Sequence, residues 1–225
     1  MYVCMRKTQF APGEYYHIYN RGNNKQNIFI DERDYSRLLF LILFLQAPFP
    51  IYNISRSVSH FIRYKIFNIT EKLIARLLKE RMVELVNFTF MPNHFHLLIS
   101  ENIEGGISQY MQRIQDAFTK YFNAKYSKVG HLFQGPFQAV HISTNEQLLH
   151  LSAYIHRNQR ELKQWKNKEH NYLWSSYYDY VKENRWGDLL KTDIILEQFS
   201  NPEDFQNFVK TSGVKDLPDE KFLID

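Results

Sequence analysis

The chain has 225 residues, of which 44% are hydrophobic and 23% charged, a composition typical of a soluble globular protein. Its single cysteine excludes an internal disulfide and any cysteine-rich zinc module. A net charge of +4 permits binding to a polyanion without requiring it. We expect a cytoplasmic protein that contacts no membrane. The first residues are too polar for a signal peptide, and the apolar run Leu38–Leu45 has about half the length that spans a bilayer.

The first part of the chain alternates between strand and helix signals. Residues 51–69 carry no clear pattern and are compatible with a short helix. Elsewhere the apolar spacing, the turn residues and the capping residues predict regular elements. These are a strand over 14–20, a helix over 32–46, a helix over 71–82 with Thr70 as its N-cap, and a β-hairpin over 83–100.

The second part begins at Gly105-Gly106, which precede a long amphipathic helix. The remaining expected elements are a loop leading into a strand over 130–142, a helix over 146–160 capped by Thr144 or Asn145, and short helices over 193–199 and 202–210. Basic residues on the long helix, Arg113, Lys120 and Lys125, have two interpretations. They form a solvated helix face, or they contact the phosphates of a nucleic acid beside neighbouring tyrosines.

Two histidines stand out in the predicted hairpin. His94 and His96 flank Phe95, and residues two apart in a strand point to the same face. Two imidazoles on one face are half of a divalent-metal site. The alternative is that they are ordinary sheet histidines, so a third ligand is needed to decide.

A tyrosine and an asparagine in the helix over 146–160 are candidates to complete such a site. His150, Tyr154 and Asn158 are each four residues apart and share one helix face. Packing is the alternative role for this tyrosine, and the spacing alone does not decide between the two.

Several short motifs occur in one order along most of the chain. They are Y-H-I-Y-N-R-G-N (Tyr16–Asn23), M-P-N-H-x-H-L-L (Met91–Leu98), G-x-L-F-Q-G (Gly130–Gly135), Y-I-H-x-N (Tyr154–Asn158) and W-S-S-Y (Trp174–Tyr177). With these motifs the chain resembles the single-tyrosine HUH transposases of small bacterial insertion sequences. The likeness is greatest to the REP-associated tyrosine transposases.

The resemblance implies an α+β fold, with a ferredoxin-like antiparallel sheet and packed helices. It places the transposase domain at residues 10–190. Residues 47–81 are longer than the connection expected before the hairpin and are interpreted as an insertion, and residues 191–225 as a C-terminal helical extension.

The resemblance also implies roles for individual residues. His94, His96 and Asn158 would bind Mg²⁺ or Mn²⁺, with Gln159 as a competitor of Asn158. Tyr154 would be the nucleophile that forms a 5′-phosphotyrosine link. His150 and His156 would support the metal ligands, and Arg21 joins Arg113, Lys120 and Lys125 as a candidate DNA contact. The remaining histidines, His17 among them, are interpreted as structural or surface residues.

The expected function is that of a transposase that cleaves and rejoins single-stranded DNA at a hairpin, as a homodimer. One alternative is a domesticated relative that binds hairpin DNA without productive transposition. Another is an unrelated metal hydrolase in which Tyr154 is dispensable.

Overall fold

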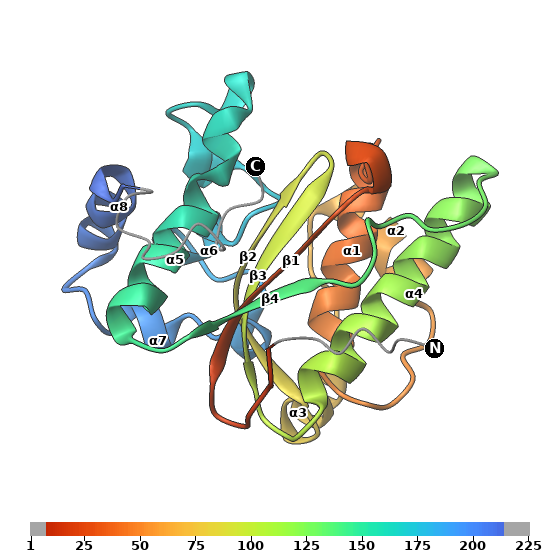
Figure 1. The fold of residues 1–225 in the computed structure, drawn as a ribbon, viewed down its shortest axis with the longest axis horizontal. Coiled ribbons are helices and arrows are strands. Elements are labelled where there is room, and N and C mark those ends of the chain that lie inside the picture. Colours follow the sequence, from red (N-terminus) through yellow and green to blue (C-terminus); the bar gives the residue numbers. More distant parts are fainter. Residues whose placement is uncertain (1–7, 214–225) are drawn as a thin grey trace.

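A four-stranded antiparallel sheet lies at the centre of the molecule, with helices on both faces (Figure 1). The computed structural model describes residues 8–213. The strands lie in the order β2-β3-β1-β4. They are β1 (Tyr15–Arg21), β2 (Val83–Met91), β3 (His94–Glu101) and β4 (Gln138–Ile142).

Helices α1, α2 and α4 cover one face of the sheet, and α5, α6 and α8 lie on the other (Figure 1). Taken with the strand order, the succession β1-α1-β2-β3-α4-β4 is the ferredoxin-like arrangement, so the predicted fold class is confirmed. The helices are α1 (Glu32–Phe44), α2 (Ile54–Tyr64), α3 (Glu71–Lys79), α4 (Gly106–Tyr126), α5 (Asn145–Arg157), α6 (Tyr177–Val181), α7 (Asp193–Leu196) and α8 (Pro202–Thr211).

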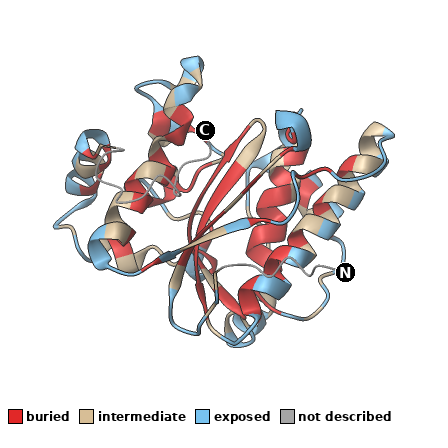
Figure 2. Ribbon diagram, viewed as in Figure 1, coloured by how far each residue is buried: buried red, intermediate tan, exposed pale blue. Residues whose placement is uncertain are grey.

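The main core lies between the sheet and the α1–α4 layer. Phe95 and Leu97 of β3 point to this side, where aromatic rings of α4 and the neighbouring loops meet them. The second half of α1 is buried over every residue from 38 to 44, because it is enclosed by the sheet, α2 and α4. Figure 2 shows this burial in red along most of the sheet and on the inner sides of the helices, whereas β4 is mostly tan and pale blue.

The opposite face of the sheet is more polar and is covered by α5. A buried hydrogen bond from Asn87 Nδ2 of β2 to Ser152 Oγ of α5, 2.9 Å long, fixes this helix on the sheet. Helix α8 packs against the outer side of α5. Helix α8 therefore supports α5 on the side away from the sheet.

Most predicted elements are confirmed, and the differences lie at helix ends. The helix predicted to reach residue 160 changes to a 3₁₀ turn, Asn158–Glu161, and the helix predicted to reach residue 82 ends at Lys79. Residues 51–69, which had no clear pattern, contain α2. The division into domain, insertion and extension stays a prediction, and residues 214–225 lie outside the described residues. In the part of the chain that is described, no helix is long and apolar enough to cross a membrane.

Candidate active site

The two histidines of the M-P-N-H-x-H motif lie on the α5 side of the sheet. In the antiparallel register His94 is opposite Arg21 of β1, and His96 is opposite Tyr19. The centres of the two imidazole rings are 5.1 Å apart. His96 is fully buried, whereas His94 lies at the more open end of the strand, with its Nδ1 2.7 Å from Asn93 Oδ1. The predicted pairing of the two imidazoles on one face is therefore present.

A third histidine, His17 of β1, completes this cluster. Its Nε2 lies 2.8 Å from Nδ1 of His96, and both side chains are fully buried. Burial lowers the pKa of His17 to about 3. Burial also lowers the pKa of His96 well below its usual value, with smaller contributions from His17 and His94. Both rings are therefore neutral near pH 7, and one proton lies between them.

Tyr154 reaches the histidines from α5. Its ring is perpendicular to that of His96, with the ring centres 5.5 Å apart, and its centre is 6.3 Å from that of His17. The side chain is half-buried. Strands β1 and β3 and helix α5, far apart in the sequence, thus bring these side chains together. The prediction named His94, His96 and Tyr154.

Asn158 lies one helical turn after Tyr154, where α5 ends. Its Nδ2 donates to the carbonyl oxygen of Tyr154 at 3.0 Å, and its amide oxygen accepts no hydrogen bond from the described residues. Gln159 is fully buried and differently engaged. Its Oε1 accepts from Thr89 Oγ1 at 3.2 Å, and its Nε2 donates to the carbonyl oxygen of Glu169 at 3.2 Å. Of the two amides, Asn158 has the oxygen with no partner.

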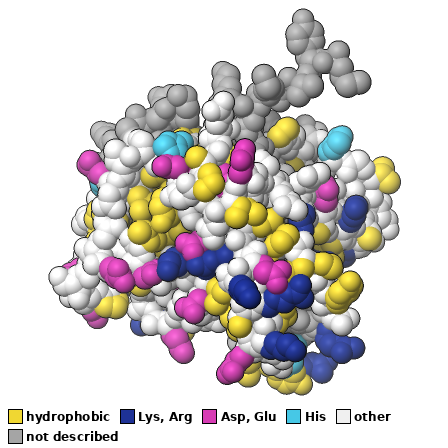
Figure 3. Space-filling view, turned by 90° about the horizontal axis from the view of Figure 1, so that it is seen from below, with side chains coloured by type: hydrophobic (Ala, Val, Ile, Leu, Met, Phe, Trp, Pro, Cys, Tyr) yellow, Lys and Arg dark blue, Asp and Glu magenta, His cyan; other side chains and the backbone are white. Residues whose placement is uncertain are grey.

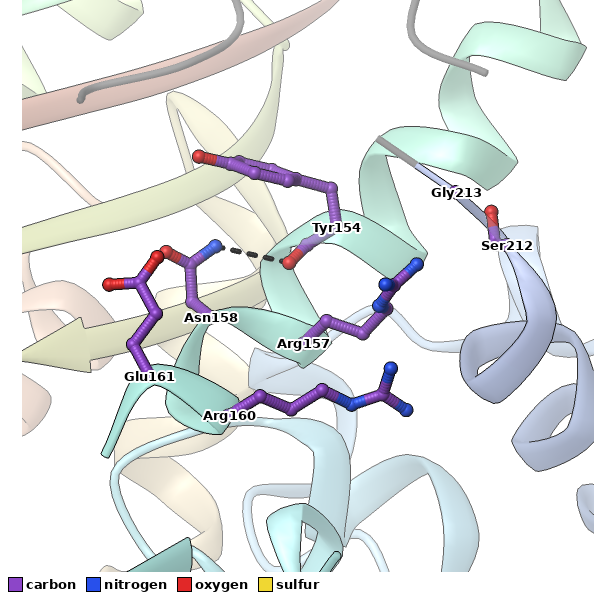
Figure 4. Close-up of a pocket in the computed structure, with 7 residues that line it drawn as sticks. All are labelled: Tyr154, Arg157, Asn158, Arg160, Glu161, Ser212 and Gly213. Carbon is purple, nitrogen blue, oxygen red and sulfur yellow. Dashed lines mark hydrogen bonds between the residues drawn. The ribbon is translucent and has the colours of Figure 1, made fainter. Parts of the chain in front are cut away.

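A pocket of about 180 Å³ opens beside Tyr154. Its lining, drawn in Figure 4, is Tyr154, Arg157, Asn158, Arg160, Glu161, Ser212 and Gly213. Tyr154, Asn158 and Glu161 point to one side, and the two arginines point to the other (Figure 4). Cationic, anionic and neutral polar groups therefore line the pocket beside the tyrosine.

The donor atoms at the site fit a divalent cation. His96 Nε2 is buried and has no hydrogen-bond partner among the described residues, although its Nδ1 is held by His17. A neutral imidazole with one nitrogen bonded to a neighbour and the other free is the usual state of a histidine ligand. Residues 8–213 contain no group of three His, Cys, Asp or Glu side chains placed to hold a metal. The predicted ligand set is two imidazoles and an amide oxygen, groups whose chemistry suits a divalent cation.

The candidate DNA contacts differ in their surroundings. Arg21 lies next to His94 across the sheet, with its Nε 3.3 Å from Gln134 Oε1. Lys120 is exposed and lines a second pocket of about 380 Å³ between α4 and the loop before β4. Lys120 therefore borders an open pocket, and Arg21 lies beside the histidine cluster.

Two other candidates already have partners within the fold. Arg113 donates to the carbonyl oxygens of Ala47 and Phe49, just after α1, with 2.9 Å to the latter. Lys125 forms ion pairs of 2.7 Å with Asp31 and Asp34. Their role in DNA binding stays an untested prediction, and their internal contacts favour a structural role.

The two histidines expected to support the metal ligands face away from His96. His150 Nδ1 lies 2.8 Å from Ser212 Oγ, and the His150 ring packs on Phe208 of α8. His156 Nε2 lies 2.9 Å from Ser176 Oγ, among aromatic rings. The supporting histidine that the structure places at the site is His17, which the sequence interpretation had assigned to structure or surface. Its signal is the Y-H-I-Y motif, in which His17 and Tyr19 alternate toward the same face.

The ferredoxin-like sheet, with paired histidines on a central strand and a tyrosine on the helix above them, has the layout of an HUH-type transposase. The chain belongs to the family of IS200-like transposases: the family described as "Transposase IS200 like" matches residues 13–158.

A solved structure with a similar fold supports this assignment. It is a REP-associated tyrosine transposase bound to a REP hairpin, with a TM-score of 0.52 and 14% sequence identity over 88% of this chain and 96% of that chain. No curated protein matches this chain.

Proposed function

We propose that this protein is a metal-dependent tyrosine transposase that cleaves and rejoins single-stranded DNA through a 5′-phosphotyrosine intermediate. The observation that carries the proposal is the contact of the Tyr154 ring with His96 in one chain, beside a buried His96 Nε2 that has no protein partner. A purely structural tyrosine on α5 does not account for that nitrogen.

The proposed reaction is balanced without an external energy source. The phenolic oxygen of Tyr154 attacks the scissile phosphorus, a tyrosine–phosphate bond forms, and the bond to the 3′-oxygen breaks. The leaving strand ends in a 3′-hydroxyl, which takes up the proton lost by the tyrosine. Attack of a 3′-hydroxyl on the phosphotyrosine reverses the sequence, so rejoining needs no ATP.

Each residue of the site has a proposed task. A divalent cation, Mg²⁺ or Mn²⁺, would be held by His94, His96 and Asn158, and when bound would offset the negative charge that develops on the phosphate oxygens. His17 keeps the proton of His96 on Nδ1 and so directs the Nε2 lone pair into the site. Arg21, opposite His94 in the sheet, would contact a phosphate next to the scissile one.

The proposed substrate is single-stranded DNA next to a hairpin. The solved relative with this fold is bound to a REP hairpin. The DNA that flanks a hairpin is single-stranded. Because Tyr154 is half-buried, it can reach only a strand whose backbone is free to bend into the site. We further propose that the protein acts as a homodimer in the cytoplasm.

A covalent-adduct assay tests the proposal. Labelled hairpin oligonucleotides with single-stranded flanks are incubated with protein and Mn²⁺ or EDTA, then separated on a denaturing gel. We expect an adduct that requires both Mn²⁺ and Tyr154, and that is lost in Tyr154→Phe. An adduct that survives this substitution contradicts the choice of nucleophile. Tight binding without an adduct on any hairpin favours the domesticated binder.

A further inference from the structure

The positive charge of the chain is concentrated in residues 47–81. This segment contains seven Lys and Arg residues and two Glu residues, a net charge of +5, whereas the whole chain carries +4. The remainder is therefore slightly acidic. The segment forms α2 and α3, which lie with α1 on the side of the sheet away from α5 (Figure 1).

The basic residues of α2 and α3 form an outward stripe on each helix. Helix α2 buries Ile54, Val58 and Phe61, so Arg56 and Arg63, seven residues apart, are exposed. In α3 the residues with the same exposure are Lys72, Arg76 and Lys79. Seen from below, Lys and Arg side chains gather at the lower right of the molecule, among apolar and a few acidic ones (Figure 3).

Four of these cations have no ion-pair partner in the described part of the chain: Arg56, Arg63, Lys72 and Lys79. The others are paired with Glu32, Glu80 and Glu84. The four unpaired charges are therefore available to an anionic partner.

Exposed aromatic rings accompany the charges. Tyr52 is 79% exposed and Tyr64 is 54% exposed. The guanidinium carbon of Arg63 lies 5.9 Å from the centre of the Tyr64 ring. Cations that follow a phosphate backbone, with rings on which bases stack, are characteristic of surfaces that bind single-stranded nucleic acid.

Other anionic partners fit less well. A helix that lies on a membrane turns its apolar face to the lipid, but the apolar face of α2 is buried against the core. Duplex DNA offers phosphates but keeps its bases stacked on one another, which leaves Tyr52 and Tyr64 without a partner. We propose that α2 and α3 form a second DNA-binding surface, which holds single-stranded DNA on the side of the sheet away from Tyr154. This inference goes beyond the proposed cleavage reaction.

Binding measured by fluorescence anisotropy tests the proposal with the full chain and labelled oligothymidine. The test variant replaces the four unpaired cations by alanine: Arg56→Ala, Arg63→Ala, Lys72→Ala and Lys79→Ala. A control variant removes the same charge from exposed lysines beyond α5: Lys163→Ala, Lys166→Ala, Lys168→Ala and Lys182→Ala. We expect the test variant to bind at least about tenfold more weakly than the control. Its slope of log affinity against log salt should fall by about 3, since each phosphate contact contributes about 0.7.

A second variant separates stacking from charge. Tyr52→Ala combined with Tyr64→Ala should weaken binding of oligothymidine by about tenfold and leave binding of a duplex of equal length unchanged. If the four-cation test variant and the four-lysine control lost the same amount of oligothymidine affinity, the proposal would be overturned, because net charge alone would then explain binding. If the two tyrosine substitutions weakened binding of the duplex as much as binding of oligothymidine, that result would also overturn the proposal.

The adduct assay keeps this proposal distinct from the proposed function. With a short oligonucleotide at saturating concentration, the four-cation variant should still form the Tyr154 adduct. If the wild-type protein forms none, the cleavage proposal fails while the anisotropy result stands.

Discussion

Nε2 of His17 is 2.8 Å from Nδ1 of His96, and this bond fixes which nitrogen of His96 faces the site. In the proposed site His96 donates from Nδ1, and because a neutral imidazole has one donor and one acceptor nitrogen, a lone pair is then left on Nε2. His17→Ala should therefore weaken Mn²⁺ binding by about 10- to 100-fold, as removing the partner of a metal-bound histidine does elsewhere. Calorimetric titration of the DNA-free protein with Mn²⁺ measures this directly.

A conservative variant distinguishes positioning from packing at His17. His17→Gln keeps a carbonyl acceptor for His96 and should recover most of the Mn²⁺ affinity. His141→Ala, at an exposed histidine of β4 paired with Glu14, is the matched control and should change nothing. Equal metal affinity in wild type and His17→Ala would show that the bond has no positioning role.

Substitution should distinguish the roles of Asn158 and Gln159. Asn158→Ala should weaken Mn²⁺ binding and slow adduct formation, because it removes the amide oxygen without a protein partner. Gln159→Ala leaves Thr89 and the Glu169 carbonyl without their buried partner, so it should cost about 1–3 kcal/mol of unfolding free energy. Denaturant unfolding and Mn²⁺ titration of both variants decide the assignment. The reverse pattern would make Gln159 the ligand.

Acid stability should depend on Asp34, which is fully buried at the start of α1. Burial alone would raise its pKa, but hydrogen bonds from Lys125, the Ile30 amide, Tyr126 and Tyr121 outweigh it and lower the pKa below the ordinary 3.8. A carboxyl with a lowered folded-state pKa stabilises the fold above its unfolded-state pKa. This contribution disappears as the pH falls through the folded-state value.

Asp34→Asn should therefore cost about 3 kcal/mol at neutral pH, the usual effect of breaking a buried ion pair. The difference from wild type should shrink as the pH falls below about 4. Urea unfolding across pH measures both quantities, with Asp116→Asn at an exposed position as the control. A difference that is constant with pH would contradict the lowered pKa.

Arg113 and Arg21 should have opposite phenotypes. Arg113→Ala removes donors from the carbonyls that follow α1 and should lower the unfolding free energy by about 1–2 kcal/mol, with unchanged DNA affinity. Arg21→Ala should weaken DNA binding and leave stability nearly unchanged. Paired unfolding and anisotropy experiments check this. Weaker DNA binding by a fully folded Arg113→Ala would restore that residue as a DNA contact.

The fold could be predicted from sequence because its signals are local or motif-based. The Met91-Pro92-Asn93 turn set the hairpin, and the alternation around Phe95 placed His94 and His96 on one face. Thr70 and Thr144 capped the helices that follow them, as expected. The secondary structure of residues 51–69 could not be predicted, because the apolar face of α2 consists of only three buried residues among polar ones.

The missing part of the candidate site depended on strand register. His17 reaches His96 because β1 pairs with β3 so that Tyr19 is opposite His96, and no single strand reveals its partner's register. The roles of Arg113 and Lys125 could not be predicted either. A basic residue that binds a carbonyl or carboxylate elsewhere in the fold has the same spacing in the sequence as a basic residue exposed to solvent.

The hydrogen bond between Asn87 and Ser152 has a kinetic consequence. It fixes α5 on the sheet of its own chain, so Tyr154 meets His96 without help from a second copy. In the proposed mechanism, each molecule would therefore hold a complete set of reacting groups. With DNA in excess, the rate of adduct formation should be first order in protein, and the adduct yield per protein molecule should not change on dilution, even where copies associate to exchange strands.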